Sequence, residues 1–255
     1  MTTALVTGGT AGIGAAFARA LAERGHDLIL VARDAERLAS AAVELGERYG
    51  VAVETLRADL AVDSDVAAVA DRLADAERPV DILVNNAGYG LHVKLLDDDL
   101  AAHRRAIDVM CLAVLALGGA AGRAMRARGH GLIINVASLA AYISQGAYSP
   151  IKAWVLAYSE GLANELHGSG VQVTVVNPGW VRTEFHERAG IKTSSIPDFI
   201  WVESDRVARE TLADADKKRV ISVPTKRWKL QKALARHAPR SAIRWASRML
   251  SRSRQ

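Results

Sequence analysis

Tyr148 and Lys152 lie four residues apart in a Tyr-Ser-Pro-Ile-Lys segment. On a helix this spacing places the phenol and the ammonium on one face. An unperturbed tyrosine, with a pKa of about 10, exchanges protons poorly at neutral pH, but a fixed cation beside it stabilises the phenolate and lowers that pKa. We therefore predict a proton-transfer pair in which Tyr148 is the acid and base.

Ser138 is the third residue of this candidate catalytic group. It follows the β-branched run 132–136, which is typical of a strand. Open α/β sheets bind their ligands at the carboxyl ends of their strands. A hydroxyl group there can hold a substrate oxygen.

A glycine-rich segment connects a predicted strand at 4–7 with a predicted helix at 13–24. Glycines in this context allow a tight turn and a close approach of the backbone to a pyrophosphate, whose charge the N–H groups of the helix N-terminus stabilise. The segment therefore predicts a dinucleotide-binding loop. Its candidate cofactor residues are Gly8, Thr10, Gly12, Ile13 and Gly14.

Ala32 and Arg33 stand at the end of the second predicted strand, where an NAD site carries an acid that accepts from the ribose 2′-hydroxyl. A carboxylate there would repel a 2′-phosphate, whereas Arg33 can bind that phosphate through charge-assisted hydrogen bonds. The sequence thus favours NADP(H). The nearest acid, Asp34, is better explained as the N-cap of the next helix.

Short β-branched runs alternate with longer Ala-, Leu-, Arg- and Glu-rich stretches, which predicts parallel strands joined by crossover helices. We expect a doubly wound (Rossmann-type) α/β sheet of about seven strands with helices on both faces. The predicted strands are 4–7, 28–32, 52–57, 82–85, 132–136, 171–177 and 220–223. The predicted helices are 13–24, 35–48, 64–77, 99–127, 148–167 and 204–214. The segment 179–202 has no clear period and is predicted to be a long connection.

With the glycine loop and the Tyr148/Lys152 pair, these patterns cover the chain from residue 2 to about 225, and this body resembles the short-chain dehydrogenase/reductase family. Further motifs carry the resemblance. Asp59-Leu60 stands where that family binds adenine. Asn86-Ala87-Gly88, preceded by Asn85, follows the fourth predicted strand. Pro178-Gly179, preceded by Asn177, stands with Thr183 where the family holds the nicotinamide carboxamide.

The resemblance implies the roles of these residues. Tyr148 would be the acid–base, Lys152 would anchor the ribose and lower the tyrosine pKa, and Ser138 would orient the carbonyl. Hydride would pass directly between the nicotinamide and the carbonyl carbon of the substrate. The family usually dimerises through two long helices, here about 99–127 and 148–167, so we expect a homodimer or homotetramer.

Two departures from the family pattern concern the catalytic group. Met110 stands where the family usually has an asparagine that helps to hold a water near the catalytic lysine, and a thioether is only a weak acceptor. The segment from Ser138 to Tyr148 is about three residues shorter than the common family spacing. The role of Ser138 therefore depends on how that loop closes.

The residues expected around the substrate are mostly apolar and aromatic, which favours a lipophilic ketone, aldehyde or acyl chain. They are Tyr89, Leu91, His92, Tyr142, Ile143, Trp180, Phe185, Phe199 and Trp201. His92 and His186 could also touch the substrate, but an ordinary loop histidine is the favoured interpretation of each. Neither has metal-ligand spacing, and we predict no metal site.

The 255-residue chain is half hydrophobic and is predicted to form one domain, 1–225, followed by a basic helical tail, 226–255. A predicted strand begins close to Met1, and Cys111 is the sole cysteine, so we expect a cytoplasmic protein without disulfides. The apolar run 109–122 is too short to span a membrane.

Charge is segregated along the chain. From Lys217 to the end there are 13 lysine and arginine residues and no acidic residue, whereas 20 basic and 28 acidic residues precede it. Pro239 divides two short helical segments, and in the second Ala242, Trp245, Ala246 and Met249 share one face. Such a basic amphipathic helix can lie on a membrane surface, or it can pack its tryptophan face on the body or on a second subunit. No nucleic-acid reading motif is present, so we expect no nucleic-acid partner.

Two further functions of other classes compete with an oxidoreductase. The first is an NADP(H)-binding sensor with weak or no catalysis, for which Met110 is the sequence support and against which Tyr148 and Lys152 argue. The second is a membrane-recruited scaffold that acts through the tail, which is compatible with catalysis.

Overall fold

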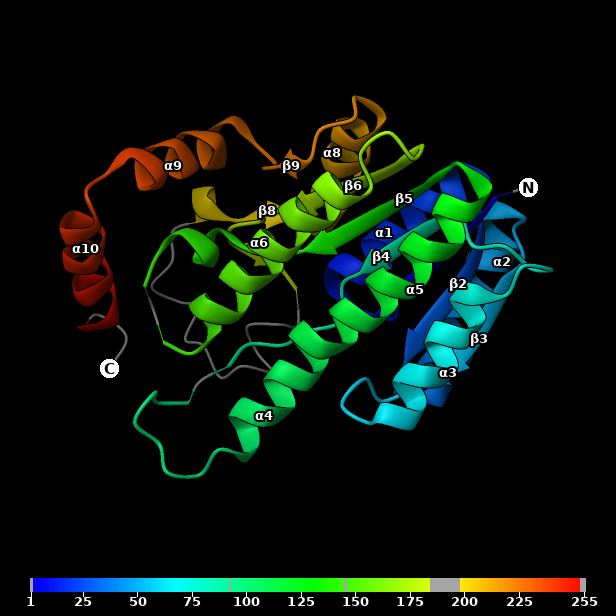
Figure 1. The fold of residues 1–255 in the computed structure, drawn as a ribbon, viewed down its shortest axis with the longest axis horizontal. Coiled ribbons are helices and arrows are strands. Elements are labelled where there is room, and N and C mark those ends of the chain that lie inside the picture. Colours follow the sequence, from blue (N-terminus) through cyan, green and yellow to red (C-terminus); the bar gives the residue numbers. More distant parts are fainter. Residues whose placement is uncertain (1, 92, 145, 184–197, 253–255) are drawn as a thin grey trace.

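The computed structural model describes residues 2–91, 93–144, 146–183 and 198–252. Parallel strands form a seven-stranded sheet in the order β3-β2-β1-β4-β5-β6-β9, with helices on both faces (Figure 1). Its strands are β1 (Thr3–Thr7), β2 (Asp27–Ala32), β3 (Val53–Arg57), β4 (Ile82–Asn85), β5 (Gly131–Val136), β6 (Val171–Val176) and β9 (Ile221–Ser222). The predicted doubly wound α/β fold is therefore confirmed.

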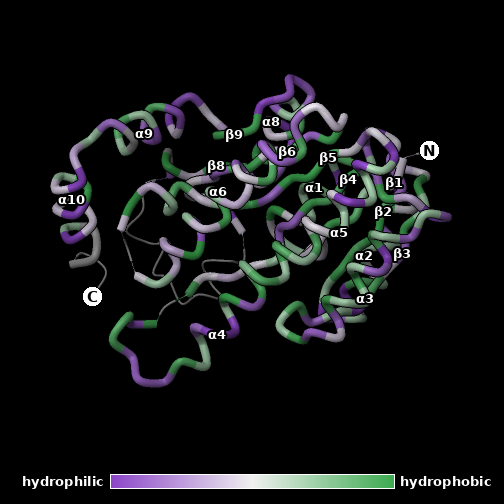
Figure 2. The backbone as a smooth tube through the Cα atoms, viewed as in Figure 1, coloured by the Kyte–Doolittle hydropathy of each residue, from purple (hydrophilic) through white to green (hydrophobic). Residues whose placement is uncertain are grey.

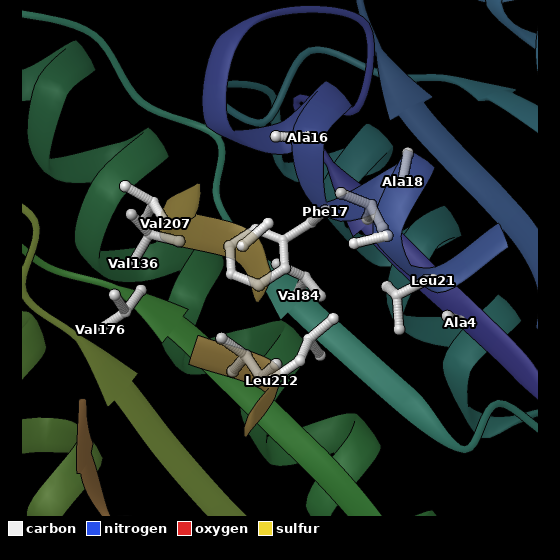
Figure 3. Packing of buried hydrophobic residues seen from close by; sticks show 14 of the residues in the cluster. Ala4, Ala16, Phe17, Ala18, Leu21, Val84, Val136, Val176, Val207 and Leu212 are labelled. Atoms are coloured by element: carbon white, nitrogen blue, oxygen red, sulfur yellow. The ribbon is translucent and has the colours of Figure 1, made fainter. Parts of the chain in front are cut away.

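Helices cover the two faces of the sheet in two separate hydrophobic cores. One core includes α1 (Gly12–Glu23), α2 (Ala35–Tyr49) and α8 (Ser204–Asp216). In this core Phe17 of α1 lies among Val84 of β4, Val136 of β5, and Val207 and Leu212 of α8 (Figure 3). The second core includes α3 (Asp63–Ala74), α5 (Ala113–Arg128) and α6 (Tyr148–Glu165). Because both faces of the strands are buried, the strands are nearly continuous apolar runs rather than alternating ones.

The predicted helix at 99–127 is a continuous run from 101 to 128 with an irregular middle. It consists of α4 (Ala101–Ile107), a π-helical turn at Asp108–Leu112 and α5. By length and composition this 28-residue run is apolar enough to cross a membrane, but most of its most apolar part is buried inside the protein. It packs against the sheet and α3, as the core helix of a globular domain does.

The predicted long connection 179–202 contains a small second sheet. β7 (Val181–Arg182) pairs in parallel with β8 (Val202–Glu203), and a 3-10 turn at Asp198–Ile200 precedes β8. Strands of two residues are too short to produce a period in the sequence. Residues 184–197 lie outside the described part of the chain.

The tail forms two helices, α9 (Lys226–His237) and α10 (Arg240–Arg252), at the end of the molecule opposite the N-terminus (Figure 1). Hydrophilic stretches run along both helices (Figure 2). Trp228 of α9 is only 1% exposed and belongs to the core that contains α1. The tail therefore begins inside the core of the body, and the division after residue 225 stays a prediction.

Candidate active site

The order of the strands reverses at β1, which lies between β2 and β4. Open α/β sheets bind ligands outside the carboxyl ends of their strands at such a point. The glycine loop follows β1, and Asn86 follows β4. Ser138 lies two residues after β5, and Pro178 lies two residues after β6. The fold thus brings four separate predicted motifs to one edge of the sheet.

Ser138 and Tyr148 are in direct contact, because the tyrosine hydroxyl hydrogen-bonds the serine side chain. The Ser138 hydroxyl also accepts from the Ala140 N–H at 3.1 Å and lies 3.4 Å from the Pro178 carbonyl oxygen. A 3-10 turn at Leu139–Tyr142 shortens the path between the two residues. The short segment therefore closes, and Ser138 lies beside the phenol.

Lys152 is buried one helical turn after Tyr148, with 4% of its surface exposed. Its Nζ donates to the carbonyl oxygen of Val136 at 2.9 Å and lies 5.6 Å from the centre of the Tyr148 ring. Burial lowers the pKa of Lys152 to about 8, against an opposing contribution from Cys111. Sequence and structure agree that the ammonium and the phenol share one face of α6.

The expected lowering of the Tyr148 pKa is wrong for the protein alone. Burial raises the pKa of Tyr148 above its ordinary value, and the hydrogen bond with Ser138 opposes that shift only in part. The Lys152 ammonium is directed to the Val136 carbonyl oxygen and the ring, so it does not offset the desolvation of the phenol. Tyr148 is therefore protonated at neutral pH.

Lys152→Met is expected to stabilise the protein without cofactor. Lys152 has a folded-state pKa of about 8, below the usual 10.5, so burial of the charge costs stability fully below pH 8. That cost fades as pH rises toward 10.5, because the unfolded state then also loses the proton. We expect the variant to raise the free energy of unfolding by on the order of 2 kcal/mol at pH 7, and by much less at pH 10.

Denaturant unfolding at the two pH values measures this effect, and Lys94→Met, which removes an exposed charge, is the control. A loss of stability of the same size at both pH values would mean that the bond to the Val136 carbonyl outweighs the cost of burying the charge.

Asn86 fixes the shape of the glycine loop. Its side-chain amide donates to the carbonyl oxygens of Thr7 at 2.9 Å and Gly8 at 3.3 Å. The Thr7 hydroxyl in turn accepts from the backbone N–H groups of Asn86 and Ala87. A Cβ at Gly14 would collide with the Gly8 carbonyl and the Asn86 amide, so glycine is required by this close approach.

The start of α1 suits a phosphate group. The N-cap residue, Ala11, makes no side-chain hydrogen bond to the helix, which leaves the first N–H groups of α1 available to an anion. Gly12 has a positive φ of 54° and lies against the Thr183 side chain. Ile13 packs against the core beneath, and Thr10 is half-buried in the turn. The residues present therefore fit a pyrophosphate.

The loops after β2 and β3 hold the residues predicted to bind the adenosine part of the cofactor. Arg33 is exposed, and its carbonyl oxygen accepts from Arg57 Nε at 3.2 Å. Asp34 accepts from two N–H groups at the start of α2, which confirms it as an N-cap. Leu60 is buried in the core that contains α5. Asp59 itself is bound by Arg105, a partner from α4 that the sequence analysis did not identify.

The segment after β6 holds the residues predicted to bind the nicotinamide. The Pro178 carbonyl oxygen accepts from the Leu139 N–H at 2.9 Å, which joins this segment to the Ser138 loop. A Cβ at Gly179 would lie 2.6 Å from the indole ring of Trp228. Trp228 of α9 therefore packs against Gly179. No local sequence signal indicates this contact between distant segments.

The side chains of Met110 and Lys152 both lie beside Gly88 of the Asn86-Ala87-Gly88 motif. Its side chain is fully buried in the π-helical turn. A Cβ at Gly88 would lie 3.1 Å from the Met110 sulfur and 3.7 Å from Lys152 Nζ. The thioether thus packs where the family's asparagine is expected, and the lysine keeps its own partner in Val136.

The residues expected around the substrate separate into groups. Trp180 and Trp201 meet edge to face with ring centres 5.7 Å apart, and Tyr142 and Ile143 lie in or beside the turn after Ser138. Tyr89 and Leu91 pack against the core that contains α5. His92, Phe185, His186 and the side chain of Phe199 lie outside the described residues. Within the described part of the chain no group of three or more His, Cys, Asp or Glu could hold a metal ion.

Comparison with known proteins agrees with this geometry. Residues 2–193 match the family model described as short chain dehydrogenase. The chain is 38% identical over 186 residues to the cis-4-hydroxycyclohexanecarboxylate dehydrogenase of Sinomonas cyclohexanicum, covering 71% of this chain and 73% of that protein.

Two solved structures share the whole architecture. One is a short-chain dehydrogenase from Sphingobium yanoikuyae in complex with NADPH, with a TM-score of 0.84 at 35% identity. The other is the bulky-bulky ketone specific alcohol dehydrogenase from Comamonas testosteroni, with a TM-score of 0.79 at 28% identity. In both comparisons the match covers 94% of this chain and 96% of the other. The chain belongs to the short-chain dehydrogenase/reductase family and is an oxidoreductase of the kind that uses a nicotinamide cofactor.

Proposed function

We propose that this protein is an NADPH-dependent oxidoreductase that transfers a hydride between nicotinamide and a carbonyl or alcohol substrate. The contact of Ser138 with Tyr148, one helical turn from the buried Lys152 and at the same sheet edge as the glycine loop, carries this proposal. Met110 was the sole sequence support for a sensor without catalysis. Its packing leaves the three catalytic candidates in place, so a sensor or scaffold role is not supported.

When bound, the nicotinamide cofactor supplies or accepts the hydride. Ser138 would hold the substrate oxygen, and Tyr148 would donate a proton to that oxygen during reduction and take it back during oxidation. The phenol is in the protonated form that reduction requires, as any tyrosine is at neutral pH, and burial raises the pKa of Tyr148 further. Lys152 would bind the ribose hydroxyls of the cofactor through an ammonium that is already oriented by Val136.

The preference for NADP(H) over NAD(H) rests on Arg33. Arg33 is exposed and comes directly after β2, whose last residue is Ala32 rather than an acidic residue. The complex of the Sphingobium yanoikuyae protein with NADPH supports the same choice.

A lipophilic carbonyl compound is the proposed substrate. The Trp180–Trp201 pair at the base of the connection after β6, together with Tyr142 and Ile143, gives the substrate side aromatic and apolar surface. The likeness to the Comamonas testosteroni alcohol dehydrogenase, an enzyme specific for bulky-bulky ketones, is consistent with this.

The test is a panel of ketones and aldehydes in which NADPH consumption is followed. Bulky aromatic or aliphatic ketones should be reduced faster than small polar carbonyl compounds. Failure of a preparation that binds NADPH to reduce any carbonyl compound would contradict the proposal.

A homodimer or homotetramer is the proposed assembly. Three large hydrophobic residues on the two long helices are exposed: Leu112 at the end of the π-helical turn, Leu115 of α5 and Trp154 of α6. Burial of such side chains against a second copy stabilises an assembly in proportion to the apolar area removed from water.

The proposal also includes a cytoplasmic location and contact of the basic tail with an anionic membrane surface. α10 packs on the body through Ile243 and Ser247, whose hydroxyl accepts from the Ser144 N–H at 3.2 Å. Trp245 and Met249 remain 65% and 51% exposed. Trp245 and Met249 are therefore not packed on the body of their own chain, which leaves a membrane surface or a second subunit as the partner of this face.

Trp245→Ser with Met249→Ser is expected to abolish sedimentation of the protein with anionic vesicles at low salt, because these side chains and the neighbouring arginines supply the binding. Val43→Ser, which removes an exposed side chain from α2, is the control. Truncation after residue 225 is unsuitable because it removes the buried Trp228. Absence of vesicle binding by the unmodified protein would rule out the membrane contact.

A further inference from the structure

Arg105 connects two elements that are far apart in the sequence at the adenine end of the site. Its Nη2 atom lies 2.7 Å from Oδ2 of Asp59. Arg105 is in α4, and Asp59 is two residues past the end of β3. The side chains are 42% and 29% exposed, so the pair lies at the surface with one edge open to a ligand.

The Asp59 carboxylate is held in one orientation by several partners. Its Oδ1 atom accepts from the Ala61 N–H at 3.1 Å, while Oδ2 accepts from Arg105. The Asp59 backbone N–H is itself bound to Asp65 at 2.8 Å. Each carboxylate oxygen keeps a further lone pair, so the group can still accept from an N–H of a ligand.

The charge of Arg33 also acts on the Asp59 carboxylate. Burial would raise the pKa of Asp59, but the hydrogen bonds of Arg105 and Ala61 and the charges of Arg105 and Arg33 outweigh it and leave that pKa below its ordinary value. The same two arginines oppose the rise that burial causes in the pKa of Tyr89. Arg33 and Asp59 also follow the ends of neighbouring strands, because Ala32 of β2 is paired with Arg57 of β3.

A carboxylate beside a phosphate site presents an electrostatic problem. Asp59 is ionised at neutral pH, and its charge would repel a 2′-phosphate bound by Arg33. With Arg105 in place the three charged groups sum to one positive charge, whereas without it they sum to zero. Arg105 therefore offsets the repulsion while it fixes the carboxylate for hydrogen bonding.

We propose that Arg105 is a specificity-determining residue for the cofactor, which holds Asp59 for the adenine and neutralises it so that a 2′-phosphorylated nucleotide is accepted beside it. This inference rests on the proposed use of NADP(H). It adds a second arginine, from α4, to the Arg33 after β2 that the sequence indicates.

Equilibrium binding of NADPH and NADH to the full-length protein, followed by fluorescence, tests the inference without depending on activity. At low salt, Arg105→Gln is expected to raise the Kd for NADPH about tenfold and the Kd for NADH less than about threefold. The lost charge acts mainly on the 2′-phosphate, which NADH lacks. The difference should shrink at high salt. Arg105→Lys, which keeps the charge, should retain most of the preference.

Arg104→Gln is the matched control, since it removes the same charge from an adjacent, exposed position of α4. Asp59→Asn provides a double-mutant cycle. If Arg105 acts by neutralising Asp59, its removal should change the NADPH preference much less in the Asp59→Asn background. Thermal unfolding of each variant identifies any loss of fold. If Arg105→Gln does not fold, Arg105→Lys decides, because a folded Arg105→Lys protein that lost the NADPH preference would overturn the role of the charge.

The outcomes separate this inference from the proposed function. If the unmodified protein prefers NADPH but Arg105→Gln affects both nucleotides equally or neither, the role of Arg105 is overturned and the cofactor assignment stands. If the unmodified protein shows no preference for NADPH, both the cofactor assignment and the role of Arg105 are wrong.

Discussion

Tyr148→Phe is expected to lower the rate of carbonyl reduction by at least about a hundredfold, the usual scale of positioned acid–base catalysis, while NADPH binding stays nearly unchanged. The substitution removes the one hydroxyl that both contacts Ser138 and lies one turn from Lys152. The ring and its packing remain. The missing proton donor should therefore appear in kcat rather than in the Kd for NADPH.

Tyr158→Phe is a matched control for this experiment. Tyr158 is on the same helix, and its buried hydroxyl has no hydrogen-bond partner among the described residues, so its removal should leave turnover unchanged. Full turnover by Tyr148→Phe on the best substrate would show that another group donates the proton.

Ala32→Asp combined with Arg33→Ala is expected to reverse the cofactor preference. The change introduces a carboxylate that repels a 2′-phosphate and accepts from a ribose 2′-hydroxyl, and it removes the guanidinium that would bind the phosphate. Since hydrogen bonds to charged groups contribute about 1.5–3 kcal/mol each, the native preference should be on the order of tenfold to a hundredfold.

The ratio of kcat/KM values for NADPH and NADH measures this reversal. Arg37→Ala is the control, because Arg37 is an exposed arginine of the same segment whose charge is paired with Asp34. Equal use of both cofactors by the unmodified protein would contradict the role of Arg33.

The sequence predicted the architecture well where local patterns are strong. Buried strands such as β1 and β5 are nearly continuous apolar runs, and the glycine loop marks the first crossover. The 3-10 turn after Ser138 could not be predicted, yet it is what brings Ser138 to Tyr148 across a short segment. The geometry of that contact therefore required the structure.

Other features of the site depend on contacts between distant segments. Arg105 meets Asp59 across 46 residues, and Trp228 supports Gly179 from the tail. Neither contact leaves a local pattern in the sequence. The raised pKa of Tyr148 was missed for a related reason, because the sequence gives the charges near a phenol but not the extent of its burial.

Transfer of deuterium from NADPH labelled at nicotinamide C4 to a ketone tests the central claim most directly. With one of the two stereospecifically labelled forms of NADPH, we expect an alcohol product that carries one deuterium on the former carbonyl carbon. With unlabelled NADPH in heavy water, that carbon should carry none. Alcohol that lacks deuterium from both labelled forms, or that takes it from the solvent, would contradict direct hydride transfer by this protein.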